Sequence, residues 1–84
     1  MNKANLQHIL DIERFRPAIY CLDGGSPNDR LCLAEERGGW SVYYSERGER
    51  FDEDWFASED DACQELLHRL RELPIVQSRL STSS

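Results

Sequence analysis

The chain has 84 residues, 39% of them hydrophobic, and a formal net charge of −6 at pH 7. This length predicts one domain with one small core. The acidic balance argues against direct binding to nucleic acid or to anionic membranes, because both need clustered Lys and Arg, and it favours a basic protein as partner.

The first third of the chain predicts a helix, a strand and a loop. In residues 5–14 (NLQHILDIER), Leu6, Ile9 and Leu10 form a short helical stripe, and Pro17 ends any helix there. The apolar residues 18–22 (AIYCL) predict a short strand. Residues 23–29 (DGGSPND) are rich in turn formers and predict a loop.

Residues 30–56 contain three runs typical of strands, at 30–36, 40–46 and 49–56. Gly38-Gly39 and Arg47-Gly48 are interpreted as two-residue turns, which predicts an antiparallel meander with residues 18–22 as a fourth strand. These turns pair Leu33 with Tyr44 and Trp40 with Trp55. The predicted register collects one apolar face: Leu31, Leu33, Trp40, Val42, Tyr44, Phe51 and Trp55.

A second helix is predicted from Ser58, a capping residue with Asp61 three positions later, to the stop at Pro74. Its apolar stripe is expected to cover the sheet: Ala62, Cys63, Leu66, Leu67, Leu70 and Leu73. The predicted fold class is therefore α+β. It comprises a short N-terminal helix, an antiparallel three- to four-stranded meander and a C-terminal amphipathic helix on one face. Residues 1–74 form the single predicted domain, and residues 75–84 are expected to be a partly disordered tail.

No residue pattern predicts a catalytic site, a cofactor or a metal. The three cysteines lack a CxxC spacing, and the first residues lack the apolar run of a signal peptide. We therefore expect reduced thiols and a cytoplasmic location, with a disulfide or metal site as the alternative. His8 and His68 lack the short ligand spacing of a zinc site. Asp52 and Asp54 could form an acid–base pair, but so small a domain leaves little volume for a substrate cleft.

The most informative feature is a stretch from 52 to 65 with seven acidic residues and no basic one. Three of them suit the start of a helix. Asp52 and Asp54 are less easily explained, because Asp is disfavoured in strands and both are predicted to lie away from the core, near Tyr43. Exposed tyrosines beside carboxylates are typical of protein-binding surfaces, unless the first helix covers this face. The predicted partner-binding residues are Tyr20, Tyr43, Asp52, Asp54, Glu59, Asp60 and Asp61.

Residues 38–70 resemble small bacterial immunity proteins encoded beside polymorphic or contact-dependent toxins. The matching features are the W-x-V-Y-Y-S-E-R-G hairpin, the helix start F-x-S-E-x-x-A-C-x-x-L-L and the upstream turn Y-C-L-D-G-G-x-P-N-D. The resemblance implies a cytosolic inhibitor of a cognate toxin domain, such as a nuclease or another nucleotide-directed effector, and no toxin-contact residues are carried over. The alternative function is a homodimeric structural or regulatory module that pairs through the Tyr43 face or a free strand edge.

Overall fold

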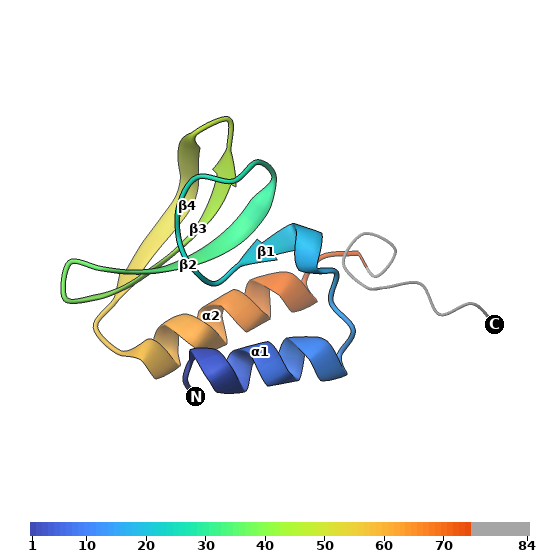
Figure 1. The fold of residues 1–84 in the computed structure, drawn as a ribbon. Coiled ribbons are helices and arrows are strands. Elements are labelled where there is room, and N and C mark those ends of the chain that lie inside the picture. Colours follow the sequence, from blue (N-terminus) through green and yellow to red (C-terminus); the bar gives the residue numbers. More distant parts are fainter. Residues whose placement is uncertain (75–84) are drawn as a thin grey trace.

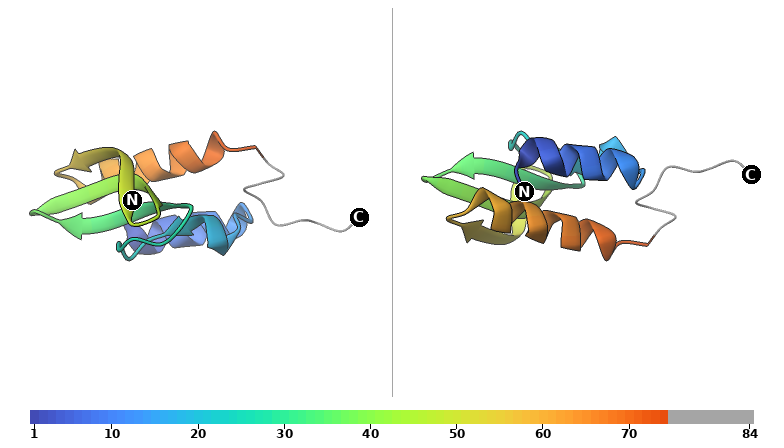
Figure 2. Two further views of the ribbon diagram at one scale, coloured as in Figure 1. Left: turned by 90° about the horizontal axis from the view of Figure 1, so that it is seen from above. Right: turned by 90° about the horizontal axis from the view of Figure 1, so that it is seen from below.

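The computed structural model describes residues 1–74, so the predicted tail at 75–84 lies outside the described part of the chain. The elements in chain order are α1 (Lys3–Ile12), the 3₁₀ turn η1 (Pro17–Ile19), β1 (Tyr20–Cys21), β2 (Arg30–Glu36), β3 (Gly39–Glu46), β4 (Glu49–Phe56) and α2 (Glu59–Arg71). The four strands form one sheet in the order β1-β2-β3-β4. The two helices lie side by side on one side of this sheet (Figures 1 and 2). The predicted α+β class is confirmed.

The sheet is mixed, which corrects the purely antiparallel prediction. β1 pairs in parallel with β2, placing Tyr20 opposite Leu31 and Cys21 opposite Cys32. The loop of residues 22–29 makes this possible, because it carries the chain back from the end of β1 to the start of β2 (Figure 1). The Gly24 N–H donates to the Leu33 carbonyl at 2.9 Å, so the loop lies against the sheet instead of forming a hairpin.

The core lies between the helices and one side of the sheet, which we call the helix face. The Ser58 hydroxyl caps α2 by accepting from the Asp61 N–H. Leu6 and Leu10 of α1 are fully buried beside α2. Five of the six residues in the predicted stripe of α2 are buried: Ala62, Cys63, Leu66, Leu67 and Leu70. The sixth, Leu73, lies beyond the end of α2 at Arg71 and is partly buried against the core. The 3.6-residue periodicity therefore located the core correctly.

The first hairpin turn is Arg37-Gly38, not Gly38-Gly39. Both turn residues have positive φ, +55° and +74°, as do Arg47 and Gly48 in the second turn, and this is the type I′ geometry that matches strand twist. The shift moves the β2–β3 register by two residues, so Leu33 pairs with Val42 instead of Tyr44. Because side chains alternate with a period of two, every residue keeps its predicted face.

A β-bulge in β4 changes faces that the sequence predicted. Tyr44 pairs with Phe51 as predicted, but Val42 then pairs with Asp54, so one extra residue lies between the two pairs. Asp52 adopts a φ of +54° at this point. The extra residue moves Trp55 off the helix face and brings Asp54 onto it. The predicted pairing of Trp40 with Trp55 is wrong, since Trp40 pairs with Phe56.

The described cysteines are all free, and two of them are fully buried. Cys63 lies on the core-facing side of α2, whereas Cys32 lies on the opposite side of the sheet, which we call the loop face. Burial raises the pKa of each of these thiols to about 11 from an ordinary value of 9.0. The folded chain therefore favours the protonated form of both thiols.

We predict that stability falls as pH rises above about 9, where unfolded thiols begin to ionise. The folded pKa is the higher one, so this contribution is complete below pH 9 and is lost as pH approaches 11. Each buried thiol should lower the unfolding free energy by on the order of 2 kcal/mol across that window. Urea unfolding at several pH values checks this. Cys63→Ala should flatten the slope, and an unchanged slope would contradict the prediction.

Candidate protein-binding surface

The loop face, where exposed tyrosines were predicted, is largely closed. Tyr43 is fully buried, which corrects its predicted exposure. Its hydroxyl donates to the Gly25 carbonyl at 2.7 Å, and the Arg50 guanidinium lies 4.0 Å from the centre of its ring. Burial raises the pKa of Tyr43 to about 12. The loop, and not the first helix, covers this face, because the parallel β1–β2 connection must cross it.

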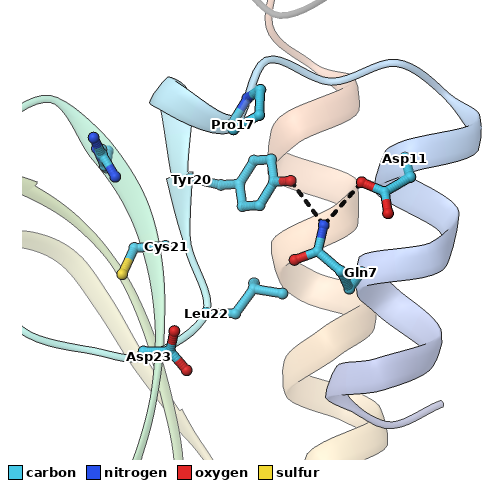
Figure 3. Close-up of a pocket in the computed structure, with 8 residues that line it drawn as sticks. Gln7, Asp11, Pro17, Tyr20, Cys21, Leu22 and Asp23 are labelled. Carbon is cyan, nitrogen blue, oxygen red and sulfur yellow. Dashed lines mark hydrogen bonds between the residues drawn. The ribbon is translucent and has the colours of Figure 1, made fainter.

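Tyr20 is also buried, at 7% exposure, which corrects the prediction that it extends an exposed surface. It points from β1 toward the helices, and its hydroxyl accepts from Gln7 Nε2 of α1 at 2.9 Å (Figure 3). The sequence pattern could not show this, because the direction of β1 decides which side Tyr20 faces. The two tyrosines therefore lie on opposite sides of the sheet and share no surface.

Most of the predicted carboxylates contact cations or N–H groups of the same chain. Asp54 lies 2.6 Å from the Arg69 guanidinium of α2. Asp60 lies 2.6 Å from the N-terminal amine, a hydrogen bond that lowers the pKa of Asp60. Glu59 accepts from the Lys3 backbone N–H at 2.9 Å. Three of the five predicted carboxylates are therefore already paired within the chain.

Asp52 and Asp61 remain as exposed carboxylates without a side-chain partner among the described residues. They lie on different elements, Asp52 in β4 and Asp61 in the first turn of α2. Glu53 contacts Arg50 at 2.6 Å and Arg37 at 3.6 Å, within a network that also includes Glu36. Within the acidic stretch, only the part that belongs to β4 thus combines exposed carboxylates with exposed apolar side chains.

The outer edge of β4 is the most exposed part of the sheet. β4 is the last strand in the sheet order, and no described element pairs with its outer side. Phe51 is 41% exposed and Trp55 is 45% exposed, although both were predicted to be core residues. Phe51 lies opposite Tyr44 on the helix face, whereas Trp55 lies opposite Ser41 on the loop face. An aromatic side chain therefore flanks the free edge on each side of the sheet.

The side chains of β4 also give this edge a negative charge. The strand carries four carboxylates and one guanidinium, a net charge of −3 within eight residues. Glu49 and Asp52 contact no cation of the described chain, whereas Glu53 and Asp54 do. We define the β4 edge surface as the exposed residues Glu49, Phe51, Asp52 and Trp55.

A second feature, which the sequence did not predict, is a shallow pocket between α1 and β1. Its volume is about 340 Å³, and Figure 3 shows its lining. Gln7 Nε2 donates to Asp11 as well as to Tyr20, so the polar groups on the α1 side are already paired. On the other side of β1 the pocket includes Cys21 and Arg30.

Among the described residues, no three His, Cys, Asp or Glu side chains are placed to hold a metal, and no helix has the length and apolarity needed to cross a membrane. Searches against protein-family models, curated proteins and solved structures gave no match to this chain. Its class is thus a two-layer α+β domain with a free, acidic and aromatic strand edge. We infer its function from that surface.

Proposed function

We propose that this protein is a non-enzymatic cytoplasmic inhibitor of the immunity-protein class, which binds a basic toxin domain through the β4 edge surface. The observation that carries the proposal is the free edge of β4, flanked by two exposed aromatic side chains and bearing a net charge of −3. Large aromatic side chains with nearby carboxylates provide contact area and electrostatic steering toward a cationic target.

The edge offers main-chain as well as side-chain contacts, apart from the Asp52 carbonyl, which accepts from Arg69 Nη1. Every second residue of an edge strand directs its backbone N–H and C=O away from the sheet, where an extended segment of a partner can pair with them. Phe51 and Trp55 lie on opposite sides of the sheet, so each would cover one side of such a segment. A few buried residues carry most of the binding energy of an interface, and Trp is among the residue types enriched at these positions.

The charge of β4 favours a basic partner over a second copy of the chain. Antiparallel pairing of two β4 strands about Glu53 brings residues 52–54 of one copy against the same three acidic residues of the other. Like charges directly opposite on neighbouring strands are destabilising. A partner segment with Lys or Arg instead meets Glu49 and Asp52 with opposite charge, and this supports a basic target.

The resemblance to immunity proteins is compatible with this location. The residues that carry it have structural roles: Tyr43 is buried under the loop, Ser58 caps α2, and Leu66 packs in the core. Within the resembling segment, the hairpin motif occupies residues 40–48 and the helix-start motif residues 56–67, so residues 49–55 lie between them and belong to neither motif. The resemblance thus describes a scaffold, and the strand between the motifs is free to differ with each cognate partner.

The experiment produces the C-terminal domains encoded by the genes next to this one in a bacterial host, each alone and together with this protein, and keeps a domain that arrests growth when alone. We predict rescue of growth by the native chain and its loss with Phe51→Ala. Glu49→Lys should slow association by about tenfold at low salt, because it reverses charge at the edge without altering the bulge. Growth of the host measures the rescue, and surface plasmon resonance with purified proteins measures the association rate.

Two matched controls locate the surface. Ile12→Ala removes another exposed apolar side chain, 66% exposed on α1, and Asp61→Lys makes the same type of charge change on α2. Both should leave rescue and association within about twofold of the native values. Loss of binding in the controls but not at β4 would place the surface elsewhere. No rescue and no binding would refute the inhibitor, and a dimer in a concentration series would favour the homodimeric module.

A further inference from the structure

Two of the free cysteines, Cys21 and Cys32, are direct neighbours on adjacent strands. They are Cα partners in the parallel β1–β2 pair. Adjacent strands lie about 4.8 Å apart, which is within the Cα separation of about 4.4–6.8 Å that a disulfide spans. Residues in register on parallel strands point to the same side of the sheet, and Cys21 packs against the cluster that contains Cys32. The two sulfur atoms therefore lie on one face.

The two thiols differ in their access to solvent. Cys21 is half-buried and lines the pocket between α1 and β1, and its side chain points away from Tyr20 across β1 (Figure 3). Cys32 is fully buried beside it. A reagent in solution therefore meets Cys21 first, and Cys32 is reached only from within the protein.

The pocket gives a small reagent a place to reach Cys21. Its lining holds one guanidinium, Arg30, and two carboxylates, Asp11 and Asp23. Asp23 pairs with Lys3, whereas no ion pair or hydrogen bond of the Arg30 side chain is found in the described part of the chain. The pocket thus combines a half-buried thiol with charges of both signs, and a second thiol lies behind the first.

Only two weak hydrogen bonds must break before the two sulfur atoms can bond to each other. The Cys21 thiol donates to the Gly24 carbonyl at 3.3 Å, and the Cys32 thiol donates to the Arg30 carbonyl at 3.6 Å; both are weak thiol hydrogen bonds. β1 contains only two residues and forms an edge of the sheet, so it can shift by a few tenths of an ångström more easily than a central strand. Cys63, by contrast, belongs to α2 and lies in the other core cluster.

We propose that Cys21 and Cys32 form a thiol modification site that closes to an intramolecular disulfide by exchange with a small disulfide, RSSR. The Cys21 thiolate attacks one sulfur of RSSR, the S–S bond breaks, and RS⁻ leaves with the electron pair. The Cys32 thiolate then attacks the Cys21 sulfur of the mixed disulfide and releases the second RS⁻. The protons of the two cysteines end on the two released thiolates, so two cysteines are oxidised and one RSSR is reduced to two RSH.

The second step, in which Cys32 attacks the mixed disulfide on Cys21, depends on the two cysteines being close, because burial keeps Cys32 protonated. The high pKa of Cys32 leaves little thiolate, so it reacts slowly with any reagent in solution. The mixed disulfide on Cys21 is held next to Cys32 on the adjacent strand. This high effective concentration compensates for the small fraction of Cys32 thiolate. Cys63 has the same high pKa but no cysteine beside it, so it serves as an internal control.

The test treats the full reduced chain with oxidised glutathione at about pH 8 and follows intact mass and alkylated peptides. The native chain and Cys63→Ala should both become about 2 Da lighter, with the new bond mapped between residues 21 and 32. Cys32→Ser should stop as a mixed disulfide on Cys21, about 305 Da heavier, and Cys21→Ser should stay unmodified. A reducing dithiol should restore the native mass.

Three results would overturn the proposal. One is a stable glutathione adduct on Cys21 of the native chain, since it would show that Cys32 does not reach the mixed disulfide. The second is modification of Cys63 as fast as Cys21. The third is no reaction in the native chain. None of these results depends on the proposed inhibitor function, because the readout uses the isolated protein.

Discussion

Gly39→Ala is expected to lower the free energy of unfolding by about 3 kcal/mol, the upper end of the range typical of overpacking. Gly39 is a buried strand residue at the start of β3. A Cβ built on it lies 2.7 Å from Cε2 of Trp55 and still closer to Cζ2 of that ring and to the Phe56 carbonyl oxygen. The indole cannot move away freely, because its Nε1 donates to the Glu36 carbonyl at 3.2 Å.

The adjacent glycine provides the control for this prediction. Gly38 has a φ of +74°, but a Cβ there meets no atom within 4 Å. Gly38→Ala should therefore cost only backbone strain, about 1 kcal/mol. Urea unfolding followed by tryptophan fluorescence measures both variants. Equal costs at the two positions would mean that the Trp55 ring does not lie against β3.

The same pair of glycines shows how far the sequence could specify the sheet. Alternating polarity located the three long strands, and the α2 stripe located the core. The choice between Gly38-Gly39 and Arg37-Gly38 as the turn could not be made from composition, because both pairs can adopt positive φ. What decides it is Trp55, whose ring needs a residue without a Cβ beneath it, and this is a contact between residues 16 positions apart.

The candidate site was harder to predict, because two long-range features determine it. The bulge at Asp52 reverses the faces of the residues after it, so Trp55 became exposed and Asp54 turned toward α2. The parallel pairing of β1 directs the loop over Tyr43. The acidic stretch looked unpaired because the cations that contact it, Arg69 and the N-terminal amine, lie outside it in sequence.

Arg69→Met is expected to lower the free energy of unfolding by about 2–3 kcal/mol, because Arg69 is the side chain that fixes the bulge. The Arg69 side chain is only 16% exposed, and its Nη1 donates to the Asp52 carbonyl at 2.8 Å. Its Nη2 contacts Asp54 and its Nε contacts Glu65, each at 2.6 Å. Methionine keeps much of the apolar stem but leaves the bulge carbonyl without this donor.

Arg71→Met separates this effect from the loss of an ordinary surface charge. Arg71 is two residues further along α2, is half exposed and forms an ion pair with Glu13 of α1. Its loss should cost less than about 1 kcal/mol, as is usual for an exposed pair. Thermal and urea unfolding compare the two variants, and amide hydrogen exchange at residues 51–54 should accelerate only in Arg69→Met. If both variants lose the same stability and exchange at β4 is unchanged, another interaction must hold the bulge. The position of Trp55 on the β4 edge surface would then not depend on α2.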